Sequence, residues 1–284
     1  MNAELEKLIM TAVDLPSIPI VATKVIEMIE QEDVNIEKLA EAVSSDPAVA
    51  ARILKLSNSA YYGCQRQINT LSAAIMLLGF NTLKSLVVAT SIKGISKRFG
   101  LTEKMLWEHA VGAALAAREI ATKVRIVNPE TAFLAGLFHD IGKTIMNDLD
   151  PKKFQTVMMR CYNEMLPFEE VERKVFSFSH SEVGALVIRK WNFPEALSTA
   201  IMHHHQVGAV DIPDQYELFL TAITSMANLF CKKLGIGERE PNDELDLATT
   251  PEAQLLNYTP ETIAQAQESF SETFENNKSF FIGD

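Results

Sequence analysis

At residues 131–143 the chain reads Thr131-Ala-Phe-Leu-Ala-Gly-Leu-Phe-His-Asp-Ile-Gly-Lys143, an apolar segment interrupted by the doublet His139-Asp140. Imidazole and carboxylate groups are the side chains that hold borderline transition metals. Histidine is also confined to one part of the chain, since all six lie between residues 109 and 205: His109, His139, His180, His203, His204 and His205. This distribution predicts either a metal centre or a histidine-rich core.

The doublet carries further residues at helical spacing. Successive side chains on a helix point about 100° apart, so His139 and Asp140 can share one ion only if it lies over the ridge between them. Ala135 and Gly136, one turn earlier, leave room for a facing helix to approach closely. Lys143 lies on the face of His139, where its ammonium could meet a phosphate or pair with an acidic ligand.

The composition is ordinary for a soluble globular protein and excludes some partners. The chain has 284 residues, of which 47% are hydrophobic and 22% charged, enough for one large or two modest domains. Its formal net charge of -11 argues against binding to nucleic acid or to anionic lipid, because a surface that binds these polyanions has to be positively charged. The basic pairs at 97–98 and 232–233 are too short to reverse this. We expect no nucleic-acid partner and no membrane partner.

The cysteines and the N-terminal residues predict the cellular compartment of the protein. The three cysteines are scattered without a Cys-x-x-Cys pair, which argues against a disulfide framework or a zinc ribbon: Cys64, Cys161 and Cys231. Residues 1–10 are amphipathic and acidic, unlike a signal peptide. The most apolar stretch, Leu83 to Ile95, contains two lysines and is too short to span a bilayer. These features predict a cytoplasmic protein.

Apolar residues recur at spacings of three and four throughout, so the sequence predicts an all-α fold. Expected helix starts are marked by caps or prolines: Asn35, Asp46-Pro47, Asn128-Pro129, Ser179 with Glu182, and Pro194. One helix should close at Gly79, and the helix after Asn128 should run to about Met146. We predict an N-terminal helical subdomain (1–100), a helical subdomain with the candidate metal site (101–235), and an acidic loop with a surface helical appendage (236–284).

The segment Ala-Gly-Leu-Phe-His-Asp-Ile-Gly-Lys143 resembles the signature of the HD superfamily of metal-dependent phosphohydrolases. Its pattern is a histidine, matched by His109, then the His-Asp doublet and a distant aspartate. Four ordered motifs resemble the HDOD family, an output-domain branch of bacterial signalling: Leu-Pro-Ser-Ile-Pro19, Ser-Asp-Pro-Ala48, Leu-Ser-Asn-Ser-Ala-Tyr-Tyr-Gly63 and Ala-Ile-Met-Leu-Leu-Gly79. The likeness covers about residues 14–205 and implies an HD-type helical bundle with an additional N-terminal helical subdomain.

The HD-GYP phosphodiesterases of cyclic-di-GMP supply a second comparison. Their later ligands are a histidine that opens a helix, which His180 resembles, and a His-His pair that ends another, which His203 and His204 resemble. Three consecutive residues spread over most of a helical turn, so at most two of residues 203–205 can face one site. The Gly-Tyr-Pro segment is absent after Gln206, which argues against cyclic-di-GMP hydrolysis by that route.

The resemblance implies one ion held by His109, His139 and Asp140, and a second held by His180 with His203 or His204. The ions would be divalent iron, manganese, nickel or zinc, with no organic cofactor. Asp140 and Lys143 are the candidate catalytic residues, with Lys143 offsetting phosphate charge. Where the superfamily has its distant aspartate, this chain offers Asn228, whose neutral amide oxygen is a weaker ligand.

Three interpretations remain open. The favoured one is a bacterial HDOD-type regulatory module that binds a signalling protein, with the first-half helices as the partner surface. The alternative is a metal-dependent phosphohydrolase acting on a nucleotide or other phosphoester. The third is a structural histidine core without an ion, whose rings would hydrogen-bond to the backbone. Asn58 and Tyr61 could bind a ligand, but a helix cap and a packing aromatic ring explain them equally well.

Overall fold

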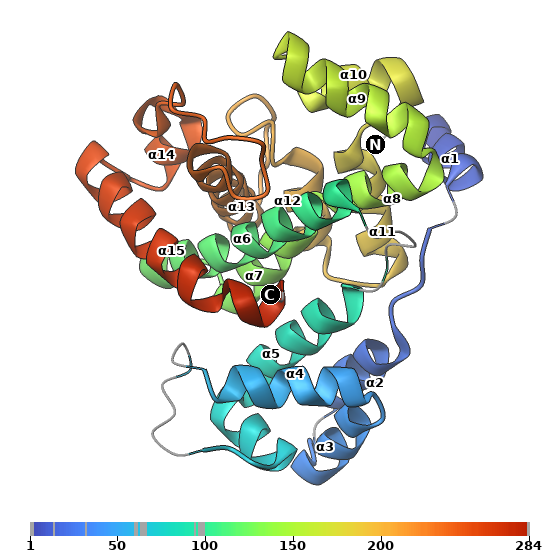
Figure 1. Ribbon diagram of the computed structural model, residues 1–284, viewed down its shortest axis with the longest axis vertical. Coiled ribbons are helices and arrows are strands. Elements are labelled where there is room, and N and C mark those ends of the chain that lie inside the picture. Colours follow the sequence, from blue (N-terminus) through green and yellow to red (C-terminus); the bar gives the residue numbers. More distant parts are fainter. Residues whose placement is uncertain are drawn as a thin grey trace. The chain divides into compact units, whose positions relative to one another are not determined.

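The computed structural model describes residues 3–13, 15–31, 33–59, 62, 67–93, 95 and 100–282 (Figure 1). Every regular element in these residues is a helix, which confirms the predicted all-α fold. The helices are α1 (Ala3–Ala12), α2 (Ile20–Ile29), α3 (Ile36–Ser44), α4 (Pro47–Ser57), α5 (Leu71–Ile92), α6 (Leu101–Val124), α7 (Pro129–Phe138), α8 (Ile141–Leu149), α9 (Pro151–Glu164), α10 (Phe168–Phe176), α11 (His180–Lys190), α12 (Glu195–His203), α13 (Gln215–Leu234), η2 (Leu247–Thr249), α14 (Pro251–Leu255) and α15 (Pro260–Phe281).

The helices group into two compact units. The larger unit contains residues 1–16 and 96–268, and the smaller unit contains residues 17–95 and 269–284. We expected residues 236–284 to form a part of their own. Their contacts instead divide them, so that residues 236–268 pack with the larger unit and the remainder with the smaller one.

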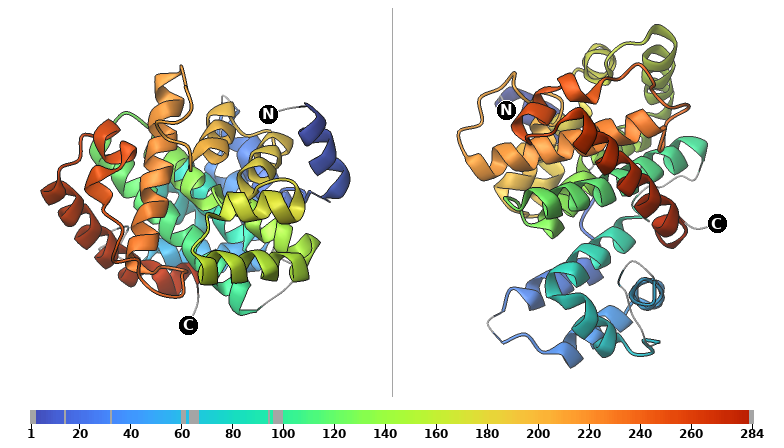
Figure 2. Two further views of the ribbon diagram at one scale, coloured as in Figure 1. Left: turned by 90° about the horizontal axis from the view of Figure 1, so that it is seen from above. Right: turned by 90° about the vertical axis from the view of Figure 1, so that its left-hand side faces the viewer.

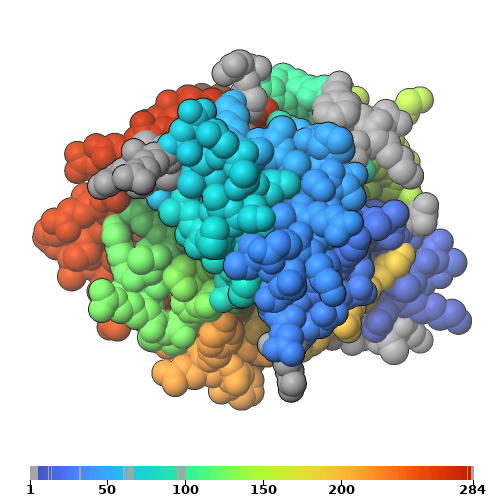
Figure 3. All heavy atoms as spheres, turned by 90° about the horizontal axis from the view of Figure 1, so that it is seen from below, coloured from blue at the N-terminus to red at the C-terminus, as the bar shows by residue number. Residues whose placement is uncertain are grey.

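The smaller unit is built on α5, against which α2, α3 and α4 pack. Figure 3 shows the surface of these helices, coloured blue to cyan. Two predicted caps are present: the Asn35 side chain accepts from the Lys38 amide at 2.8 Å, and Asp46 accepts from the Ala48 amide at 2.9 Å. Each cap satisfies a backbone donor that the first helical turn leaves unpaired.

Helix α5 is interrupted at Gly79, as the sequence predicts. Gly79 has φ 74° and ψ 165°, outside the helical region, so two helical segments meet there. By length and composition α5 could cross a membrane. A core helix passes the same test, and the residues of α5 pack against α2, α3 and α4 in this unit.

Asn58 has a structural role at the end of α4. Its side-chain amide donates to the carbonyl oxygens of Leu54 and Ile68, both at 2.8 Å, and its oxygen accepts from the Ile68 amide at 2.7 Å. These bonds pin the chain that enters α5 and account for Asn58 without a ligand. Tyr61, the other residue singled out there, lies outside the described residues.

The larger unit is organised around α6, which packs along α7 and α13, while α11 packs on α8 and α12 (Figure 2). The predicted close approach at Gly136 is made by α6. A Cβ on Gly136 would lie 2.4 Å from the carbonyl oxygen of Ala113. The small residue therefore lets the two helix backbones touch, which brings α6 and its His109 next to the His139 segment.

The segment after α13 is a loop over residues 235–246, as predicted, followed by short helices and α15. The C-terminal helix, expected as a surface appendage, buries Phe270 and Phe274, which are 1% and 4% exposed. At its end the Lys93 ammonium donates to the carbonyl oxygens of Phe281 and Ile282 at 3.0 and 2.8 Å. These contacts tie the end of α15 to the smaller unit.

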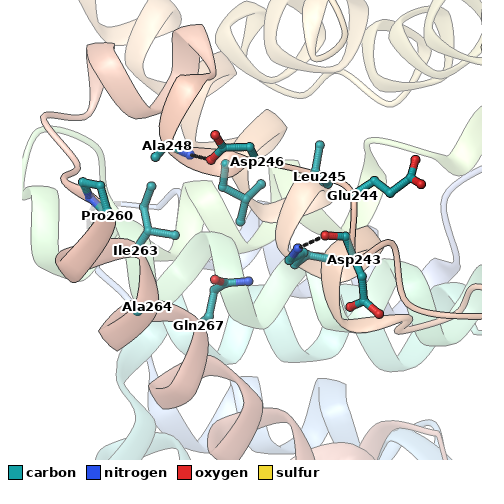
Figure 4. A pocket seen from close by; sticks show the side chains of 11 residues that line it. Asp243, Glu244, Leu245, Asp246, Ala248, Pro260, Ile263, Ala264 and Gln267 are labelled. Carbon is teal, nitrogen blue, oxygen red and sulfur yellow. Dashed lines mark hydrogen bonds between the residues drawn. The ribbon is translucent and has the colours of Figure 1, made fainter.

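A pocket of about 320 Å³ lies between residues 243–248 and the start of α15 (Figure 4). Asp243, Glu244 and Asp246 line it together with apolar side chains such as Ile263. No histidine is among its described lining residues. The pocket is therefore distinct from the histidine cluster.

Candidate metal centre

The doublet His139-Asp140 lies at a break between two helices. We predicted one helix from Asn128 to about Met146, and this prediction is wrong in detail: α7 ends at Phe138, α8 begins at Ile141, and Asp140 has φ -107° and ψ 11°. The break removes the 100° divergence of neighbouring helical side chains. It allows both side chains to face one point.

Asp140 is the centre of the cluster. Its Oδ2 lies 3.3 Å from Nε2 of His139 and 3.7 Å from Nε2 of His109, and its Oδ1 lies 3.2 Å from Nε2 of His180 and 3.8 Å from Nε2 of His204. All five residues are at most 4% exposed. Helices α6, α11 and α12 and the α7–α8 break therefore bring four distant histidines to one carboxylate.

The histidines form two groups around this carboxylate. His109, His139 and Asp140 make one group, and Asp140, His180, His204 and His205 make the other. Within each group the potential ligand atoms all lie within 4.8 Å of one another. This geometry suits one or two ions that share Asp140.

Each of the four buried imidazoles is oriented through its Nδ1 atom. The acceptors are the carbonyl oxygens of Ile236, Gly136 and Ile201 for His109, His139 and His204, at 3.0, 2.7 and 2.7 Å, and Glu172 Oε2 for His180, at 2.7 Å. A carbonyl oxygen only accepts, so Nδ1 must carry the proton in the first three rings. Their Nε2 lone pairs are left facing the centre, as in metal-binding histidines.

Three buried atoms at the centre have no hydrogen-bond partner among the described residues: Nε2 of His139, Nε2 of His204 and Oδ1 of Asp140. A buried polar atom without a partner costs about 1–3 kcal/mol. A purely structural histidine core would pair these atoms, whereas a cation satisfies all three at once. The residues present therefore fit a bound transition metal.

The electrostatics at Asp140 and His139 favour the ligand forms of both groups. Burial alone would raise the pKa of Asp140, but the neighbouring imidazoles and the Lys143 ammonium hold it well below its usual range. Burial lowers the pKa of His139 to about 4, so this ring is neutral at pH 7. A carboxylate and a neutral imidazole are the forms that bind metal.

Sequence reasoning missed Glu172, which is fully buried on α10. One of its oxygens accepts from the backbone amide of His180 at 2.9 Å and faces the ring Nδ1 at 2.7 Å. Burial opposes the charged ring, but Glu172 raises the pKa of His180 to about 9. In the sequence Glu172 stands among other charged residues of an amphipathic helix and resembles a solvated position.

Of the three consecutive histidines at 203–205, the structure does not bring the predicted pair, His203 and His204, to the site. His204 is fully buried at the centre, whereas His203 lies outside both groups and contacts Oε1 of Gln206 at 3.1 Å. His205, which we did not name as a ligand, has its Nε2 3.1 Å from Nε2 of His180. Because α12 ends at His203, the next two residues leave helical spacing and can turn together toward the site.

Lys143 pairs with Asp140. The sequence had allowed this role or contact with a phosphate. Its ammonium lies 2.7 Å from Oδ2 of Asp140 and 4.3 Å from the centre of the Phe168 ring. Burial alone would lower the pKa of Lys143, but Asp140 and Glu172 raise it. The lysine is therefore a charged, buried neighbour of the candidate ligand.

Asn228, which the sequence comparison offered in place of the superfamily's distant aspartate, is a buried residue of α13. Its Oδ1 is 3.1 Å from Nε2 of His109. Since Nδ1 of His109 donates to Ile236, this Nε2 and the amide oxygen are two acceptors in contact. Such a contact needs a shared cation or the amide turned the other way.

The loop after α13 covers the His109 side of the cluster. A Cβ on Gly237 would lie 2.4 Å from the Met105 carbonyl oxygen and 2.5 Å from the His109 amide nitrogen, and Gly237 has φ +68°. Only glycine fits this approach. The next residue, Glu238, accepts from the Tyr162 hydroxyl at 2.6 Å. The loop thereby places the Ile236 carbonyl against His109.

Comparison with known proteins agrees with these motifs. The sequence model of the HDOD domain matches residues 15–207. The chain belongs to the HDOD family. It is similar over 98% of its length to an HDOD domain protein of unknown function from Geobacter sulfurreducens, with a TM-score of 0.80, 26% identity and 96% of that chain covered.

Two further likenesses place this HDOD chain among longer proteins. A Marinobacter aquaeolei protein, inferred to be a signal transduction protein, matches with a TM-score of 0.69 and 19% identity over 99% of this chain and 60% of its own. An uncharacterized Treponema pallidum protein is 23% identical over 261 residues, 90% of this chain and 50% of its own length. The chain thus spans about half the length of this curated relative.

Proposed function

We propose that this chain is a regulatory HDOD module that holds one or two divalent transition-metal ions and acts by binding a signalling protein. The observation that carries the metal is that two unpaired, buried Nε2 atoms face the Asp140 carboxylate, that of His139 at 3.3 Å from Oδ2 and that of His204 at 3.8 Å from Oδ1. Membership of the HDOD family supports the signalling role. The first-half helices of the smaller unit are the proposed partner surface.

Two features support weak turnover at this centre. Asn228 offers a neutral oxygen beside His109 where a carboxylate would add negative charge. Lys143 is occupied by Asp140 at 2.7 Å, which leaves its charge less available to a phosphate. A bound metal would supply a Lewis acid and an activated water. The chain's own residues orient the imidazoles and shield four of them from solvent.

The metal is tested by elemental analysis of untagged protein purified without added metal, comparing His204→Ala with His203→Ala. The two histidines are adjacent, but only His204 lies in the cluster. We expect up to two equivalents of iron, manganese, nickel or zinc, with the content reduced by at least one equivalent in His204→Ala and unchanged in His203→Ala. Metal-free protein, or equal loss in both variants, would contradict the proposal.

A second function, hydrolysis of a phosphoester, is favoured by the two potential ligand groups that share Asp140, an arrangement that suits a two-metal hydrolytic centre. If the site is a relaxed phosphohydrolase, Asn228→Asp should restore charge at the metal and raise hydrolysis by at least about tenfold, the effect of about 1.4 kcal/mol on the barrier. The measurement is turnover of a panel of nucleotides and simple phosphoesters by metal-loaded protein. If Asn228→Asp protein with full metal content still shows negligible turnover, the hydrolytic function is rejected and only the regulatory function remains.

A further inference from the structure

The two groups of candidate ligands face different oxygens of Asp140. We name each group by its first histidine: the His109 group is His109, His139 and Asp140, and the His180 group is Asp140, His180, His204 and His205. Oδ2 is the oxygen nearest the histidines of the first group, and Oδ1 is nearest His180 and His204 of the second. The surroundings of the two oxygens therefore decide how strongly each group can hold an ion.

The oxygen of the His109 group already has a protein cation as its partner. The Lys143 ammonium lies 2.7 Å from Oδ2 of Asp140. An ion at this oxygen would share it with the ammonium, and two positive charges so close together repel each other. Beside this group, Asn228 contacts Nε2 of His109 at 3.1 Å but adds no negative charge that would offset the repulsion. The His109 group is therefore a poor site for a further cation.

The oxygen of the His180 group has no such competitor. Oδ1 of Asp140 and Nε2 of His204 are both buried without a hydrogen-bond partner in the described part of the chain, and they lie 3.8 Å apart. Nε2 of His180 lies 3.2 Å from the same oxygen. Imidazole nitrogens can bind an ion themselves, whereas an ammonium has no lone pair to offer. An ion at Oδ1 would therefore gain these neighbours as ligands.

Glu172 strengthens His180 as a ligand. The glutamate is fully buried, and its Oε2 lies 2.7 Å from Nδ1 of His180 and accepts from the backbone amide of the same residue at 2.9 Å. The other three buried rings have a neutral carbonyl oxygen at this position. A carboxylate at one ring nitrogen fixes the ring and makes the opposite nitrogen a more basic ligand. The His180 group alone has this support.

His205 makes the His180 group accessible. It is exposed, whereas the other members of both groups are at most 4% exposed. Its Nε2 lies 3.1 Å from Nε2 of His180, and its ring centre lies 3.9 Å from that of His204. An ion that arrives from solvent can therefore reach the His180 group through His205.

We propose that the first metal ion binds to the His180 group, and that the His109 group takes a second ion only at a higher metal concentration. Glu172 acts as a positioning residue for the first site, and Lys143 disfavours the second by holding Oδ2 of Asp140. The order of binding rests on the proposed function, which assigns the ions to this cluster. Two histidines of the sequence motifs, His109 and His139, then serve the weaker site.

The test is a calorimetric titration of metal-free full chain with zinc, comparing Glu172→Gln with Glu170→Gln. Glutamine keeps an oxygen that can accept both bonds from His180 and deletes only the charge, and Glu170 is an exposed glutamate of the same helix. We expect one tight equivalent and a second that binds at least about tenfold more weakly. Glu172→Gln should weaken the tight equivalent by about 10- to 100-fold, the usual cost of losing an outer partner of a ligand, with Glu170→Gln within about twofold of the original. General damage to the fold would weaken both equivalents, whereas loss of positioning weakens only the first.

Lys143→Met tests the second site in the opposite direction. Removal of the ammonium leaves Oδ2 of Asp140 as an unpaired buried charge, so the weaker equivalent should bind at least about tenfold more tightly. A damaged fold would not produce this gain. An unchanged or weaker second equivalent would contradict the role of Lys143.

Two histidine variants assign the tight equivalent to a group. His205→Ala should weaken it and His109→Ala should keep it, because each histidine belongs to one group only. The opposite result, two equivalents of equal affinity, or equal effects of Glu172→Gln and Glu170→Gln would overturn the inference while the metal centre stands. A chain that binds no zinc would overturn the proposed function together with the order of binding.

Discussion

Replacing Asp140 by asparagine is expected to remove metal from both groups at once, because its two oxygens face opposite pairs of histidines. Oδ2 is the oxygen nearest His109 and His139, and Oδ1 is nearest His180 and His204. The change keeps the size of the side chain and deletes its charge. Loss of an outer partner of a metal ligand costs about 10- to 100-fold in affinity, so loss of a shared ligand's charge should weaken binding by about 100-fold or more.

Equilibrium dialysis followed by elemental analysis measures this effect, and His205→Ala is the informative comparison. His205 belongs to one group only, so this variant should keep the ion at His109 and His139. Asp211→Asn, at an exposed carboxylate, should keep full metal content. Retention of stoichiometric metal in Asp140→Asn would show that Asp140 is a structural acid.

The same substitution leaves Lys143 buried without its partner, which is 2.7 Å away. Breaking a buried ion pair costs about 3–5 kcal/mol. The double variant Asp140→Asn with Lys143→Met removes both charges, so it should recover most of the free energy of unfolding while binding no more metal. Urea denaturation of the metal-free proteins separates the loss of a ligand from the loss of an ion pair.

The second large effect is expected at Gly142, the point where α8 meets α11. A Cβ there would lie 2.0 Å from the carbonyl oxygen of His180 and 2.8 Å from its Cα, so backbone would have to move. Overpacking of a core costs about 1–3 kcal/mol. Gly142→Ala should therefore lower the free energy of unfolding by about that amount and weaken metal binding, because it separates Asp140 and Lys143 from His180.

Gly100→Ala is the matched control, since its Cβ would meet only the flexible end of the Glu103 side chain. It should unfold at the same urea concentration as the original protein and keep its metal. Gly142→Ala protein with unchanged stability and metal content would contradict the close approach of α8 and α11.

Local signals predicted much of the fold because they act over a few residues. The caps at Asn35 and Asp46, the break at Gly79 and the close approach at Gly136 follow from hydrogen bonding and steric size alone. The break at His139-Asp140 was missed, because apolar periodicity continues across it and nothing in the composition marks a change of direction.

The candidate site was predicted only in part. Motif order pointed to His109, His139, Asp140, His180 and His204, and the structure brings these together. Helical spacing could not choose between His203 and His205, since α12 ends within the run. Glu172 carries no local signal, because a charged residue on an amphipathic helix looks the same whether it faces solvent or a buried imidazole.

The sequence by itself determined the all-α class, the family and the residue types from which a metal centre can be made. Only the tertiary structure decided which histidines share Asp140, which carbonyl oxygens orient their rings, and whether Lys143 pairs with Asp140. The physical reason is the distance along the chain over which each kind of interaction acts. Caps and periodicity involve neighbours along the chain, whereas metal ligation and charge pairing join atoms from α6, α10, α11 and α13 that only packing brings within a few ångströms.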